Sequence, residues 1–273
     1  MARSHRFSGV SKVIAATTTQ TITFPANEIE GAGVVGYDIL FQGGADIADV
    51  ERIRVFASGD LILDMSPAQL RTWIEGTHRT GTVQPTTDTR LHIPLYMPDL
   101  VTRDERDGCQ FPLGAQPQVE IDLLNTVPAG TAIIGWTKTD VAPMYASRLY
   151  SSVLNFSASQ VNARYALQDG GVIKGIIINT VGVDRARLVL SDREVFRVPG
   201  PQFNGLTFGN DILALRMNES PVTLTDPFFV PVSFGIPAAV GSSYLELDTG
   251  AAWAGVSNEI VVWSCIQLQQ GQV

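Results

Sequence analysis

Apolar and polar residues alternate one by one along several short stretches of the chain. In residues 52–57, Ile53, Val55 and Ala57 would lie on one face of a strand, because successive strand side chains point to opposite sides. Helical periodicity is scarce, and 25 Gly and 15 Pro punctuate the alternating stretches. This pattern predicts an all-β fold of many short strands.

Residues 52–65 predict a hairpin with its turn at residues 58–60. Ser66 and Pro67 then form a helix-start signal, a cap residue followed by proline in the first turn. A short helix is therefore expected from Gln69 to about Thr77.

The hairpin pattern occurs twice, because Arg185, Arg187 and Ser191 repeat the spacing of Arg52, Arg54 and Ser58. Two unrelated β segments of similar composition would not share an order of further matches. Such matches do follow in one order: 34–41 with 172–179, 92–95 with 229–232, 119–123 with 245–249, and 132–136 with 259–263. The sequence therefore predicts one β domain written twice.

The boundary is expected near Pro143, which gives an N-terminal domain at 1–143 and a C-terminal domain at 144–273. Each domain has room for roughly eight short strands, the number found in a jelly roll. The expected fold is all-β: two tandem eight-stranded antiparallel jelly rolls, with short helices in loops.

Charge is unevenly distributed along the chain. Arg3, Arg6 and Lys12 lie in a basic N-terminal arm, residues 1–15, and residues 1–27 contain no acidic side chain. The net charge of −8 argues against a dedicated nucleic-acid binder, and the remainder beyond residue 27 carries −11. The arm is expected to contact anionic lipid or nucleic acid, with a functionless terminus as the alternative.

The composition also limits compartment and chemistry. With 45% apolar residues and a mean hydropathy of +0.13, the chain is expected to hide apolar surface against partners. Only Cys109 and Cys265 occur, without metal-type spacing, and no apolar stretch suits a signal peptide, so synthesis in the cytoplasm is expected.

No catalytic motif is found, and no enzyme activity is expected. His5, His78 and His92 are far apart in sequence, and Gly-x-Ser-x-Gly is absent. His92 lies in an apparent strand, which indicates an ordinary sheet residue rather than a catalytic base.

Two carboxylate pairs are candidate metal ligands. Glu120 and Asp122 share one face of a predicted strand, and Glu246 and Asp248 do the same in the second half. Because the feature is duplicated, a solvated sheet face is the favoured reading. A mixed-charge loop follows Asp99 and contains the candidate interface residues Arg103, Asp104, Arg106 and Asp107.

The tandem layout resembles double jelly-roll major capsid proteins of tailless icosahedral viruses, most of all corticovirus-type bacteriophages with an internal membrane. Residues 52–63, 181–196 and 139–143 carry this resemblance. It implies a structural, non-catalytic major capsid protein that forms pseudo-hexagonal homotrimeric capsomers in the virion capsid. Some relatives bind calcium, so a structural calcium ion stays an alternative to having no cofactor.

The implied partners are other copies of the chain, penton or minor capsid proteins, and lipid of an internal membrane, without sequence-specific nucleic-acid binding. Two other classes of function stay open. A receptor- or carbohydrate-binding β-sandwich would use a loop aromatic such as Trp253, and a glycan-cleaving hydrolase would need an acid cluster between domains.

Overall fold

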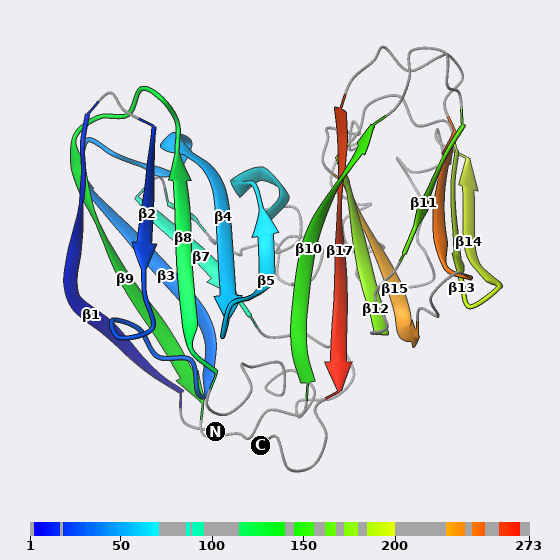
Figure 1. The fold of residues 1–273 in the computed structure, drawn as a ribbon, viewed down its shortest axis with the longest axis horizontal. Helices are drawn as coiled ribbons and strands as arrows, with labels where there is room; N and C mark the ends of the chain where they lie inside the picture. The colour runs from blue at the N-terminus through cyan, green and yellow to red at the C-terminus, as the bar shows by residue number, and fades with distance from the viewer. Residues whose placement is uncertain are drawn as a thin grey trace, which may run out of the picture. The chain divides into compact units, whose positions relative to one another are not determined.

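The computed structural model describes residues 3–16, 19–70, 86–87, 89–95, 115–139, 145–155, 162–167, 172–179, 185–199, 228–237, 242–248 and 257–267. The chain divides into two compact units, one formed mostly by residues up to Tyr150 and the other mostly by Ser151–Cys265. Strands dominate both units (Figure 1). The all-β prediction is therefore confirmed.

The first unit contains two layers of strands. One sheet has the order β1-β9-β3-β7-β6, and the other layer has the order β5-β4-β8-β2. The strands are β1 (Arg3–Ile14), β2 (Gln20–Phe24), β3 (Val34–Gly43), β4 (Val50–Ala57), β5 (Asp60–Met65), β6 (Thr86–Thr87), β7 (Arg90–Pro94), β8 (Pro117–Leu123) and β9 (Gly130–Thr139), with a 3-10 turn, η1 (Ile47–Asp49), before β4.

The later strands repeat this arrangement. They run in the orders β15-β12-β17-β10 and β11-β16-β13-β14. Their bounds are β10 (Tyr145–Asn155), β11 (Asn162–Ala166), β12 (Val172–Asn179), β13 (Arg185–Leu190), β14 (Arg193–Pro199), β15 (Phe228–Pro237), β16 (Tyr244–Asp248) and β17 (Ser257–Gln267). The division between the units falls within β10.

The two sets of strands have the same connections. Without the two-residue strand β6, the strands of each half can be numbered in chain order from first to eighth. In both halves one layer then has the order first, eighth, third, sixth, and the other has the order second, seventh, fourth, fifth. All five segment matches made from sequence fall on strands at equivalent places in this order. The duplication predicted from sequence is therefore present in the strand topology.

The two hairpins agree in backbone detail. Ser58 and Gly59 have φ of 51° and 91°, and Ser191 and Asp192 have φ of 49° and 62°. Two successive left-handed residues make the type I′ turn that suits the twist of a tight hairpin. The predicted turn at 58–60 is thus confirmed as a two-residue turn, because Asp60 already pairs with Ala57.

Each hairpin also contains a β-bulge at the same place. In the first, Val55 pairs with Leu63 and Phe56 with Leu61, so Ile62 has no opposite residue. In the second, Leu188 pairs with Phe196 and Val189 with Glu194, so one residue is again left over. A bulge bends its strand and increases the local twist, so both hairpins are bent alike.

The register corrects one of the sequence matches by a single residue. Ile39 of β3 pairs with Leu91 of β7, and the equivalent Ile177 of β12 pairs with Phe229 of β15. Phe229 is therefore equivalent to Leu91 and not to His92. The sequence match aligns Pro94 with Pro231 and is wrong by one residue. Such a shift matters because a one-residue slip moves every side chain of a strand to the opposite face of the sheet.

The core lies between the facing layers of each unit. In the first unit, alternating residues of β4 and β8 point inward, and Ile53, Val55, Val119 and Ile121 are fully buried. Burial of such aliphatic side chains stabilises a fold by about 1.5–3 kcal/mol each. Tyr37 is also fully buried, and its hydroxyl donates to the Glu30 carbonyl oxygen at 2.7 Å, so the buried polar group is satisfied.

The predicted helix start is confirmed as a capping box. The Gln69 N–H donates to Ser66 Oγ at 3.2 Å, and the Ser66 N–H donates to Gln69 Oε1 at 2.8 Å. Residues 67–70 are helical, and the rest of the expected helix lies outside the described residues.

We expect Gly59→Ala to lower the free energy of unfolding by about 1 kcal/mol, because an alanine at this left-handed position is strained. A Cβ at Gly59 would meet no atom within 4 Å, so the cost would come from the backbone alone. Gly9 is the matched control, since its Cβ would also lie in open space but its φ is not left-handed. Chemical denaturation of both variants checks the expectation, and equal losses would contradict it.

Candidate functional site

The outer face of the first unit's β2-β8-β4-β5 layer carries a ladder of charged side chains. Arg54 of β4 donates from Nη1 to Glu120 Oε2 at 3.1 Å and also contacts the Asp122 carboxylate. Thr21 of β2 donates to Asp122 Oδ1 at 2.7 Å. Arg52 pairs with Asp64 of β5, so opposite charges face each other across neighbouring strands.

The same ladder occurs on the β11-β16-β13-β14 layer. Glu246 accepts from Arg164 Nη2 at 2.8 Å and lies 4.0 Å from Arg187 Nη1, while Arg187 Nε donates to Glu194 at 2.7 Å. Asp248 accepts from Asn162, which completes the pairing of the second carboxylate. Arg54 and Arg187, which the sequence matched to each other, thus pair with the matched carboxylates Glu120 and Glu246.

Arg164 is held by two contacts in this second ladder. Its hydrogen bond to Glu246 raises the pKa of the guanidinium, which keeps its positive charge. The guanidinium also lies 4.1 Å from the centre of the Tyr244 ring, a cation–π contact. The two carboxylate pairs that the sequence offers as candidate metal ligands are therefore parts of larger networks of hydrogen bonds and ion pairs with arginine side chains.

These networks bear on the metal hypothesis. The arginines supply the positive charge that a metal ion would bring to Glu120, Asp122 and Glu246. Within the described ranges, no group of three or more His, Cys, Asp or Glu side chains comes together in a way that could hold a metal ion. The geometry is that of a sheet face stabilised by charge pairs.

The basic N-terminal segment forms a strand. Residues of β1 pair antiparallel with β9 from Arg3 to Ile14, with a register shift between Phe7 and Ser11. Arg6 Nη1 lies 3.0 Å from Glu30 Oε1, and Lys12 Nζ lies 2.7 Å from Glu28. Two of the three predicted contact cations are thus paired with acids of their own chain.

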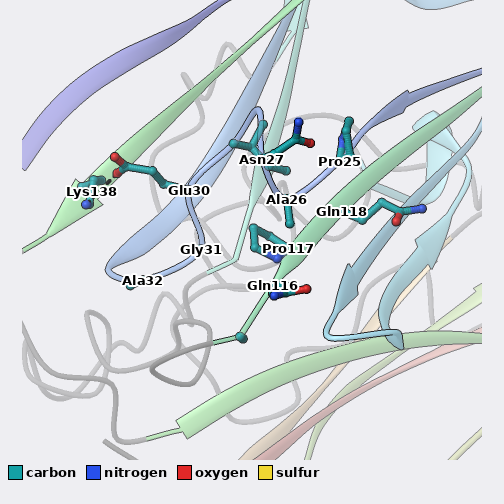
Figure 2. A pocket seen from close by; sticks show the side chains of 12 residues that line it. Pro25, Ala26, Asn27, Glu30, Gly31, Ala32, Gln116, Pro117, Gln118 and Lys138 are labelled. Atoms are coloured by element: carbon teal, nitrogen blue, oxygen red, sulfur yellow. Dashed lines mark ion pairs between the residues drawn. The ribbon is translucent and has the colours of Figure 1, made fainter.

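Glu30 is the centre of a small polar cluster beside β1. Its carboxylate lies 2.6 Å from Lys138 Nζ and accepts from Trp136 Nε1 at 3.3 Å, in addition to the Arg6 contact. The hydrogen bond from Lys138 is the main cause of a lowered Glu30 pKa. The Glu30–Lys138 pair lies at the edge of an open depression of about 730 Å³, which Gln116, Pro117 and Gln118 also line (Figure 2).

A second polar cluster lies on β3 and β7. Asp38 is almost fully buried, and its Oδ1 accepts from Arg90 Nε at 3.0 Å and lies 2.9 Å from His92 Nδ1. Burial alone would raise the pKa of Asp38, but the hydrogen bonds and positive charge of His92 and Arg90 outweigh it and lower the pKa. His92 is a sheet residue, as predicted from its strand.

Several of the sequence candidates cannot be placed. Arg103, Asp104, Arg106 and Asp107 lie outside the described residues, and so does Trp253 of the carbohydrate-binding alternative. For Arg3 only the strand backbone is described.

Sequence reasoning missed Glu30, Asp38 and the pairing of Arg54 with Glu120. A signal for the last was available, because the hairpin and the carboxylate strand both recur in the repeat. No comparable signal marks Glu30 or Asp38, since the partners of each come from a distant strand. Among the described residues, no helix is long and apolar enough to cross a membrane.

Comparison with known proteins gives a clear answer for the fold alone. No protein-family model matches the sequence, and no curated protein matches it either. The structure is similar to the major capsid protein of bacteriophage PM2, with a TM-score of 0.70 and 14% identity over 99% of both chains. The chain shares its fold with viral major capsid proteins.

Two further capsid structures extend this likeness. The STIV major capsid protein matches with a TM-score of 0.65 and 11% identity over 97% of this chain and 96% of that one. PBCV-1 VP54 matches with a TM-score of 0.54 and 9% identity over 97% and 93%. The predicted resemblance to double jelly-roll capsid proteins is therefore confirmed at the level of the fold.

We expect Arg54→Met to lower the free energy of unfolding by about 1–2 kcal/mol, because the partly buried carboxylates of Glu120 and Asp122 both lose the arginine that pairs with them. Arg187→Met is the matched control at the equivalent position, and it should cost less because Arg164 still binds Glu246. Urea denaturation of both variants measures the difference. Equal losses would contradict the expectation that Arg164 compensates for Arg187, and no loss in either variant would show that the charge pairs do not stabilise the fold.

The lowered pKa of Asp38 predicts acid sensitivity. An acid whose pKa is lower in the folded state stabilises the fold above its unfolded value, ordinarily 3.8, and this contribution is lost as the pH falls through the folded value. Asp38→Asn should therefore cost about 1–3 kcal/mol at neutral pH and progressively less below pH ~4.

Unfolding measured between pH 2 and pH 7 tests this expectation, with Asp60→Asn at an exposed hairpin position as the control. A difference between wild type and Asp38→Asn that stays constant across the whole range would contradict it.

Proposed function

We propose that this chain is the major capsid protein of an icosahedral virus, and that three copies form a pseudo-hexagonal capsomer. The observation that carries the proposal is the repeated strand order within a fold that matches the PM2 capsid protein over 99% of both chains. In this proposal each unit is an eight-stranded jelly roll, and three chains supply six similar units around a ring.

The physical logic is one of tiling. A ring of six similar blocks can pack against six neighbouring rings, and closed symmetric contacts hide apolar surface that a monomer would expose. The arginine–carboxylate ladders fit a structural role, because their arginines and carboxylates pair with one another across neighbouring strands. We propose no catalytic activity for this chain.

The partners in this proposal are other copies of the chain and the penton or minor capsid proteins that close a shell. Lipid of an internal membrane is a further proposed partner, and the virion capsid is the proposed location. We propose that the chain has no resident cofactor, with a structural calcium ion in the assembled capsid as the alternative.

Purified protein should have a solution mass of three times the 29.5 kDa chain, because the trimer is the proposed building block. Light scattering after size exclusion measures this mass, and electron microscopy should show six-lobed particles, sheets or shells. A protein that stays monomeric at all accessible concentrations and forms no ordered assembly would overturn the proposal.

A further inference from the structure

The outer faces of the two equivalent layers share a central set of charges. In the first unit Glu120 of β8 lies opposite Arg54 of β4, and in the second unit Glu246 of β16 lies opposite Arg187 of β13. The next pairs along the same strands repeat these signs: Asp122 opposite Arg52, and Asp248 opposite Arg185. Because residues opposite each other on paired strands share one face of the sheet, this central set is the same in both units.

The strand at one end of each layer adds a positive charge in the second unit only. Thr23 of β2 lies opposite Glu120, whereas Arg164 of β11 lies opposite Glu246. Arg164 is held 2.8 Å from Glu246 and 4.1 Å from the centre of the Tyr244 ring, yet its side chain is 58% exposed. Its charge is therefore fixed in position and accessible to a further acid.

The strand at the other end of each layer changes the sign of a charge. Asp64 of β5 lies opposite Arg54, whereas Arg197 of β14 lies opposite Arg187. Like charges directly opposite each other destabilise a strand pair. In the second unit Glu194 supplies a carboxylate to Arg187 at 2.7 Å, which offsets part of this repulsion. Compared with the first unit, the second therefore gains two arginines on this face and exchanges one acid for another.

The two faces consequently carry opposite net charges. The first-unit face, formed by the charged residues of β4, β5 and β8 named above, has two arginines and three acids and a net charge of −1. The second-unit face, formed by those of β11, β13, β14 and β16, has four arginines and three acids and a net charge of +1. Because the same layer forms with either set of flanking residues, the fold of the layer does not require the difference.

Charge complementarity favours another copy of the chain as the partner of these faces. Two first-unit faces, or two second-unit faces, would bring like net charges together. A first-unit face against a second-unit face of another copy joins opposite charges, which suppresses the wrong pairings. Such a contact uses a different surface on each copy, and contacts of this kind can close into a ring.

We infer that the first-unit face of one copy contacts the second-unit face of the next copy. The opposite charges of the two faces then make the two kinds of unit alternate around the ring. This inference rests on the proposed capsomer, and it adds the surfaces that build the contact and the charges that set its order.

An exchange of the flanking residues tests the inference, because each substitution copies the residue at the equivalent position of the other unit. Thr23→Arg with Asp64→Arg makes the first-unit face positive, and Arg164→Thr with Arg197→Asp makes the second-unit face negative. Each exchange alone leaves two faces of like charge. All four substitutions together restore opposite charges, with the signs reversed.

We expect each exchange alone to raise the concentration at which the trimer dissociates by about tenfold or more, and the four-fold variant to return it to within about threefold of the wild type. Light scattering over a dilution series gives this concentration, and circular dichroism with thermal unfolding verifies the fold. Gln42→Arg is the control, because it adds a positive charge at an exposed position of β3, outside both faces, and should leave the trimer unchanged.

Thr23→Arg alone keeps the test decisive if a larger exchange fails to fold. The new arginine would lie opposite Glu120, as Arg164 lies opposite Glu246, so the fold should accept it. We expect this variant to raise the dissociation concentration several-fold, because it removes the net charge of the first-unit face.

Three results would contradict the inference. Folded exchange variants that trimerise as the wild type does would overturn it but leave the proposed capsomer in place. A folded four-fold variant that trimerises as weakly as either exchange alone would show that the sign of the faces does not set the contact. A wild-type chain that never forms trimers would remove the proposed function, and the inference with it.

Discussion

Register between neighbouring strands is the constraint on which this structure depends. In the first unit, the pairing of β4 with β8 places Ile53 and Val55 beside Ile121 and Val119 on the buried face. The same register places Arg54 beside Glu120 on the outer face. A slip of one residue would bury the charges and expose the aliphatic side chains, so both faces enforce one register.

The second unit satisfies the same constraint with different residues. Leu188 pairs with Leu245, and Arg187 pairs with Glu246, as their counterparts do in the first unit. The identity of the aliphatic residues has changed, but their burial and the sign of the facing charges have not. Such a pattern explains how a fold can match distant capsid proteins at 9–14% identity.

The sequence was sufficient for much of the fold because the relevant signals are local. The alternation of polar and apolar residues predicted β4, and the hairpin pattern predicted the turn between β4 and β5. Ser66 followed by Pro67 predicted a helix cap, which the structure contains. The acidic pairs were placed on the correct strand face, but their arginine partners were not named, because pairing across strands requires knowledge of the sheet order. The buried Asp38 was missed for a similar reason, since His92 and Arg90 reach it from another strand.

The shared geometry of the hairpin tips limits how the two units can diverge. Both tips need two successive left-handed residues, and each tip is tied to the residues before the next paired strand, through Ser58 N–H to Gln116 and Asp192 N–H to Ser242. Glycine, asparagine and aspartate tolerate that backbone, whereas β-branched residues do not. The left-handed backbone therefore restricts which residues these tips accept. Buried aliphatic positions accept other apolar residues of similar volume at a smaller cost in stability.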